Sequence, residues 1–85
     1  MAGMPLVRDE AADSLYVFLV DLPVEHCEAL DERRSIEYGA DGIVVGVRFA
    51  AVSRGVRLDG LPSRRKVEAV LRASPNIMGL LRSSR

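Results

Sequence analysis

The segment 36–51 constrains the fold most, because it reads as two strands joined by a Gly/Asp turn. Its second part repeats small and apolar residues at period two, at Ile43, Val45, Val47, Phe49 and Ala51. β-Branched and aromatic residues suit a pleated strand, and Gly39 and Gly42 tolerate the positive φ angles of tight turns. The sequence therefore predicts a β-hairpin with strands over 35–38 and 43–52.

Three earlier segments also read as strands, at 5–8, 14–20 and 24–30, and polar turns separate them. Residues 15–20 are all apolar, and a strand with apolar residues on both faces needs cover on both sides. A helix across one face or a second protomer would supply the second cover, and we expect a homodimer or a stable hetero-complex. The segment 24–30 mixes charged and apolar residues and suits a sheet edge, where charge limits aggregation.

The pattern becomes helical from Ser63, which is a predicted N-cap. A predicted helix follows, with one apolar face formed at i, i+3 and i+4 by Val67, Val70 and Leu71. The same spacing recurs after Ser74-Pro75, so a second short helix is predicted around 77–81.

The chain has 85 residues, which is the size of one domain. Its apolar content of 48% is typical of a globular protein and argues against disorder. We therefore expect an α+β fold in a single domain, 1–85. It should comprise a small antiparallel β-meander of four to five strands over 5–54 and a C-terminal helical segment over 63–82.

The net charge is zero, but the charges are unevenly distributed along the chain. Residues 1–47 hold ten acidic and three basic residues, a net charge of −7. Residues 48–85 hold two acidic and nine basic residues, a net charge of +7. This split is typical of a partner-binding surface, and it also fits two halves that neutralise each other within a monomer or across a dimer.

No apolar run reaches the roughly 18–20 residues that span a bilayer, so no membrane association is expected. The start of the chain lacks the basic region of a signal peptide. The single cysteine, Cys27, has no intramolecular disulfide partner, which favours a reducing compartment. We expect a cytoplasmic protein.

Residues with catalytic or metal-binding chemistry are few. His26 and Cys27 are adjacent, and successive strand residues point to opposite faces, so they cannot easily share a metal site or a nucleophile–base pair. Carboxylates suited to acid–base chemistry occur at Asp9, Asp13, Asp31, Glu37 and Asp41, but aspartate at a turn usually has a structural role. We predict no enzyme activity and no catalytic, cofactor-binding or metal site.

The basic residues form the candidate contact site. Three cations, Arg64, Arg65 and Lys66, lie in the first turn of the predicted helix, where they oppose the helix dipole. An acidic partner or phosphates would relieve that penalty. The predicted contacts with a partner or with nucleic acid are Arg54, Arg57, Arg64, Arg65, Lys66 and Arg72. The alternative is that the acidic half of the chain neutralises them.

Three motifs together resemble a known family. They are the acidic opening D-x-x-A-D-x-L-Y over 9–16, the hairpin over 36–47, and the close Ala-Ala-Val-Ser-Arg over 50–54. In combination they resemble the small bacterial proteins of domain of unknown function 2283, over about residues 5–54. Two features depart from the family pattern: Arg8 replaces a frequent aromatic residue, and 55–85 lies outside the family core.

The resemblance implies a compact β-meander and a bacterial or phage source, and it carries over no catalytic residue. Some members are encoded beside small RelE-like toxin candidates, and this association implies an antitoxin-like role. The leading hypothesis is therefore a non-enzymatic protein-interaction module, forming a homodimer or binding a small basic protein such as a toxin. The alternatives are a structural homo-oligomer without other partners and a regulator that contacts nucleic acid through the basic helix.

Overall fold

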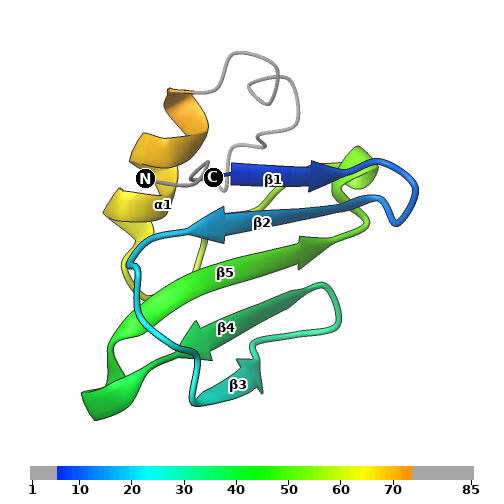
Figure 1. Cartoon of the computed structure of the whole chain (residues 1–85). Helices are drawn as coiled ribbons and strands as arrows, with labels where there is room; N and C mark the ends of the chain where they lie inside the picture. The colour runs from blue at the N-terminus through cyan, green and yellow to red at the C-terminus, as the bar shows by residue number, and fades with distance from the viewer. Residues whose placement is uncertain (1–5, 74–85) are drawn as a thin grey trace.

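The computed structural model describes residues 6–73 as a five-stranded antiparallel sheet with one α-helix against one face (Figure 1). The elements are β1 (Leu6–Asp9), β2 (Ser14–Phe18), β3 (His26–Ala29), β4 (Arg34–Tyr38), β5 (Val44–Ala50) and α1 (Arg64–Arg72), with short 3₁₀ turns η1 (Ala40–Gly42) and η2 (Val52–Arg54). The predicted α+β class, the small antiparallel sheet and the C-terminal helix are confirmed. The predicted helix around 77–81 lies outside the described residues.

The strand order is β1-β2-β5-β4-β3, so β5 occupies the centre of the sheet (Figure 1). A strictly sequential meander would pair β2 with β3. Here the chain crosses from β2 to the far edge, forms β3 and β4, and returns as β5 between the two hairpins. The register places Val47 of β5 opposite Val17 on one side and Ile36 on the other.

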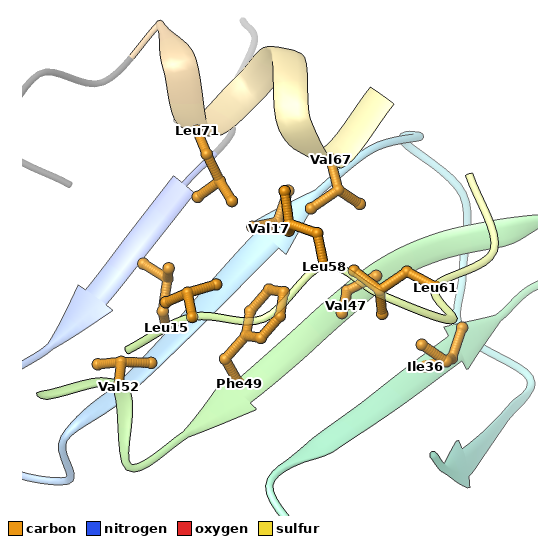
Figure 2. Packing of buried hydrophobic residues seen from close by; sticks show 11 residues of the cluster. Leu15, Val17, Ile36, Val47, Phe49, Val52, Leu58, Leu61, Val67 and Leu71 are labelled. Carbon is orange, nitrogen blue, oxygen red and sulfur yellow. The ribbon is translucent and has the colours of Figure 1, made fainter. Parts of the chain in front are cut away.

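One face of the sheet carries the hydrophobic core. Alternate residues of the three inner strands point toward α1 and toward the segment that precedes it (Figure 2). The buried cluster comprises Leu15, Val17, Ile36, Val47, Phe49, Val52, Val56, Leu58, Leu61, Val67 and Leu71. Val67 and Leu71 are both fully buried, which confirms the predicted apolar face of the helix.

The β4–β5 turn uses its glycines in two ways. Gly42 has φ 73°, and the neighbouring Asp41 also lies in the left-handed region, with φ 62°. Gly39 does not use its tolerance of a positive φ, since its φ is −98°. A Cβ at Gly39 would lie 3.0 Å from both the Pro23 carbonyl oxygen and the Val45 side chain. Close packing, not backbone conformation, requires this glycine.

Ser63 precedes α1 as predicted, but it does not cap the helix through its hydroxyl. It is left-handed, with φ 57°, and makes no side-chain cap hydrogen bond. Its backbone carbonyl accepts hydrogen bonds from the N–H groups of Lys66 (3.0 Å) and Val67 (3.1 Å). The predicted position was therefore right and the predicted capping chemistry wrong.

Candidate interaction site at the edge of the sheet

The six predicted basic contact residues are all exposed, but they come from three separate parts of the fold. Arg54 ends η2, Arg57 lies in the following loop, and the remaining four are on α1 at Arg64, Arg65, Lys66 and Arg72. The helix therefore carries the first-turn cations at one end and Arg72 at the other. The structure does not gather the six residues into one compact site.

Acidic neighbours engage two of these six residues. Arg57 makes two hydrogen bonds of 3.0 Å to the carboxylate of Asp59. Arg72 binds Glu68 one helical turn earlier, at 2.7 and 2.9 Å. Both acids belong to the C-terminal half of the chain, so local pairing, rather than the acidic N-terminal half, offsets these charges.

Four of the five carboxylates considered for acid–base chemistry make hydrogen bonds that connect parts of the fold: Asp9, Asp13, Asp31 and Glu37. Asp13 accepts hydrogen bonds from the backbone N–H and hydroxyl of Ser53, at 3.0 and 2.7 Å, and this ties the β1–β2 turn to η2. The Ser53 hydrogen bonds, helped by Arg8, hold the pKa of Asp13 below its usual value. Asp9 accepts from the N–H of Ala12 at 3.1 Å within the same turn.

Asp31 plays the corresponding part in the β3–β4 turn. It accepts from the Arg34 guanidinium at 2.7 and 2.9 Å and from the N–H of Arg33 at 2.9 Å. The same guanidinium also donates to the backbone carbonyls of Arg57 and Asp59, at 3.1 and 2.6 Å. Arg34 therefore connects this turn to the loop before α1, and its guanidinium is already engaged in contacts within the chain.

The face of the sheet opposite α1 carries a small polar network. The Tyr16 hydroxyl donates to Glu37 at 2.7 Å, and Arg48 donates to the other oxygen of that carboxylate at 3.3 Å. The Arg48 guanidinium also lies 5.3 Å from the centre of the Tyr16 ring. Desolvation, together with the hydrogen bond and charge of Glu37, raises the pKa of Tyr16, so its phenol stays protonated.

This network supplies part of the second cover that β2 was expected to need. Tyr16 lies across Gly46, where any Cβ would meet the phenol ring, and Arg48 packs over the ring. The apolar run in β2 therefore does not by itself require a second protomer. A shallow hollow of about 220 Å³ opens beside Arg48, between Ala29 and Ala50, and the β3–β4 turn borders it.

The most exposed part of the described chain is the edge strand β3 with its two flanks. Every residue from Asp21 to Glu32 is exposed. Just outside β3, Val24 and Leu30 leave 46% and 39% of their surfaces in solvent. Within β3, His26 stacks on Tyr38 at 5.0 Å between ring centroids and lies 3.5 Å from the Glu28 carboxylate.

The backbone of β3 offers free hydrogen-bonding groups along this edge. The N–H of Leu30 donates to the carbonyl of Arg34, and hydrogen-bonded pairs alternate along an antiparallel ladder. With the β3–β4 register, the backbone groups of His26 and Glu28 therefore face β4. Those of Cys27 and Ala29 face away from the sheet, where another strand can pair with them.

The sequence predicted β3 as an edge strand but did not identify it as the candidate interaction site. The sequence signal that could have pointed to this site is the distribution of residue types around Cys27. Apolar residues stand three positions to either side, at Val24 and Leu30, and Glu25, His26, Glu28 and the small Ala29 lie between them and Cys27. Such a symmetric arrangement suits an edge that pairs with another strand.

Residues 6–73 hold no cluster of three or more histidine, cysteine or acidic side chains that could bind a metal ion. The helix within this region is too short to cross a membrane. Comparison of the chain with family models, curated proteins and solved structures finds no match. The resemblance to domain of unknown function 2283 therefore stays a prediction.

Proposed function

We propose that the chain is a non-enzymatic protein-interaction module, and that β3 pairs with a strand of its partner. The exposure of the whole segment 21–32 supports this proposal most strongly. In this mode of recognition, main-chain hydrogen bonds supply affinity and alternate side chains supply specificity. Cys27 and Ala29 provide the main-chain groups, while Val24 and Leu30 provide apolar contacts.

The charge of this edge defines the partner further. The acidic residues of the segment 21–32 are Asp21, Glu25, Glu28, Asp31 and Glu32, with His26 among them. Arg34 already binds the Asp31 carboxylate. We therefore expect the glutamates and His26 to make the polar side-chain contacts with a partner strand. The antitoxin-like role is one form of this proposal, in which a small basic toxin supplies the strand.

A nucleic-acid partner has weaker support. Phosphate binding needs several cations gathered on one surface. Arg57 and Arg72 are engaged by neighbouring carboxylates, and the predicted cations are spread over three parts of the fold. The protein-interaction proposal therefore rests on β3 and not on the basic helix.

The proposal is tested by blocking β3 in the full chain. Val24→Lys places a charge at the exposed flank of β3, and Cys27→Pro removes an N–H that the β3–β4 ladder does not use. Val7→Lys is the matched control, because Val7 lies on the opposite edge in β1 and is also about half exposed. Thermal melts monitored by circular dichroism verify that each variant folds.

Association is then measured in two ways, by sedimentation of the pure protein and by tagged capture from native extract at low and high salt. We expect Val24→Lys and Cys27→Pro to lose self-association or capture of a defined protein, while Val7→Lys retains it. Association that survives both β3 variants would contradict the proposal.

A further inference from the structure

We infer that the strand paired with β3 is the β3 of a second copy of this chain, antiparallel to the first, with the twofold axis at Cys27. This inference rests on the proposed function, since it names the partner of that same edge. A twofold interface brings each residue opposite a fixed counterpart, so one choice of axis fixes every contact.

The backbone restricts where the axis can lie. The groups that face outward belong to Cys27 and Ala29, as the β3–β4 hydrogen bonds require. With the axis at Cys27, the two Cys27 residues form a hydrogen-bonded pair. Glu25 of each copy stands opposite Ala29 of the other, but its N–H already donates to the Tyr38 carbonyl at 2.7 Å, so the main-chain pairing is centred on Cys27. The two sheets would then continue as one, with both α1 helices on the same face.

The side chains select this register over its neighbours. With the axis at Cys27, His26 faces Glu28 twice and Val24 faces Leu30 twice. Each carboxylate then stands opposite an imidazole that can hydrogen-bond to it, and each exposed apolar side chain stands opposite another. An axis at Glu28 would place the two glutamates directly opposite each other. An axis at Ala29 would place Leu30 against Glu28. Both alternatives pair groups that disfavour contact.

Two pairs of like charges remain in this register. The two Glu28 residues are diagonal neighbours about 7–8 Å apart, and each faces a His26 of the other copy. The two Glu25 residues are separated by four residues along the strands, about 13 Å at 3.3 Å per residue. That distance exceeds the screening length of about 8 Å at physiological salt. Pairing also covers Val24 and Leu30, two of the large apolar side chains that are exposed within the described residues.

The register is tested by disulfide cross-linking of the full chain, because Cys27 is its only cysteine. A hydrogen-bonded antiparallel pair has Cα atoms about 5.5 Å apart, within the roughly 4.4–6.8 Å that a disulfide spans. Copper–phenanthroline with oxygen should therefore convert the protein to a covalent dimer, as the oxidant removes two electrons and two protons from the thiol pair.

Two variants without Cys27 provide the matched controls. In the Cys27→Ser background, Glu25→Cys and Ala29→Cys each place a cysteine too far from its own copy. Neither should cross-link alone, whereas a mixture of the two should form a mixed disulfide. Cross-linking of Ala29→Cys with itself, or failure of Cys27 to cross-link in a sample that sediments as a dimer, would overturn the register.

A charge exchange tests the same register without oxidation. His26→Glu places two carboxylates opposite each other in both facing pairs, so it should weaken dimerisation about tenfold. Glu28→Lys removes the carboxylate that faces His26 and should weaken dimerisation less. The double variant His26→Glu/Glu28→Lys places opposite charges in both facing pairs and should recover the dimer. Both side chains are more than half exposed, so folding should be unaffected.

The outcomes separate the inference from the proposed function. A wild-type chain that sediments as a monomer at all concentrations, yet captures another protein through β3, overturns the second copy and keeps the interaction module. If the chain is a monomer and the β3 variants capture other proteins as well as the wild type does, both the second copy and the proposed function are overturned. A Cys27-linked dimer that the charge exchange restores supports both.

Discussion

The two faces of the sheet are built from the same strands but are held by different interactions. On the helix side, Val17 and Val47 are fully buried in a hydrocarbon cluster. On the open side, their neighbours Tyr16 and Arg48 meet around the Glu37 carboxylate. Burial of apolar surface is non-directional, whereas hydrogen bonds depend on distance and angle. Substitutions on the helix side should therefore cost stability according to the apolar volume lost, and substitutions on the open side according to the contact or hydrogen-bond geometry lost.

The largest effect is expected at the centre of the buried face. Phe49 is nearly fully buried, so Phe49→Ala should lower the free energy of unfolding by about 3–5 kcal/mol through lost burial and a cavity. Urea denaturation measures this loss. Phe49→Leu keeps most of the volume and is the control that should lose clearly less. Equal losses for the two variants would show that volume does not govern this face.

A smaller effect is expected at Gly46 on the open face, for a geometric reason. A Cβ there would lie 2.6 Å from Tyr16 Cζ and 2.9 Å from the backbone carbonyl oxygen of Val17. Gly46→Ala should therefore cost about 1–3 kcal/mol of stability by urea denaturation. Adding Tyr16→Ala should relieve part of that cost, because only the backbone clash then remains. Strictly additive losses would contradict this contact.

Loss of the Tyr16 hydroxyl tests the hydrogen bond alone. Tyr16→Phe keeps the ring over Gly46 and removes the 2.7 Å bond to Glu37, so it should cost about 1–2 kcal/mol of unfolding free energy. A second measurement follows the pKa of Tyr16 by absorbance at alkaline pH. Glu37→Gln should lower that pKa, since the negative charge helps to raise it. An unchanged titration would remove Glu37 from the network.

The smallest effect concerns acid stability at the turn beside both faces. The pKa of Asp13 is lower in the folded chain than its usual value of 3.8. The folded state therefore binds fewer protons than the unfolded one, and the contribution of Asp13 is present above that value and lost as pH falls through the folded pKa. The melting temperatures of wild type and Asp13→Asn should converge from about pH 6 to about pH 2.

Glu10→Gln, in the same turn, is the matched control for Asp13→Asn. It removes a carboxylate without touching the hydrogen bonds to Ser53. A difference in melting temperature between wild type and Asp13→Asn that stays constant with pH would show that the ionised carboxylate is not what stabilises this turn.

Local elements of the fold could be predicted from the sequence because their signals are local. The β4–β5 hairpin followed from period-two residues such as Val47 and Phe49, and α1 from the spacing of Val67 and Leu71. The pairing of β2 with β5 could not be predicted, because Leu15 and Phe49 are distant in the chain and share no turn. The role of Gly39 depends on its contact with Pro23, which is also a tertiary contact.

The candidate site was harder to predict than the fold. Charge counting selected the basic residues, but the pairing of Arg57 with Asp59 and of Arg72 with Glu68 appears only when neighbours at i+2 and i−4 are weighed. The exposed edge was assigned as an edge, yet nothing in one sequence shows that Val24 and Leu30 remain uncovered. Their exposure is a property of the finished sheet.

The central position of β5 also sets the order in which a growing chain can fold on the ribosome. The β1–β2 and β3–β4 hairpins emerge first, but β5 joins them and is synthesised after both. Until β5 arrives, Val17 and Ile36 have no shared neighbour to pack against, and the cover from α1 emerges later still. Apolar surface of both hairpins therefore stays exposed until β5 and α1 have been synthesised. Partly folded chains with exposed apolar surface are prone to aggregate.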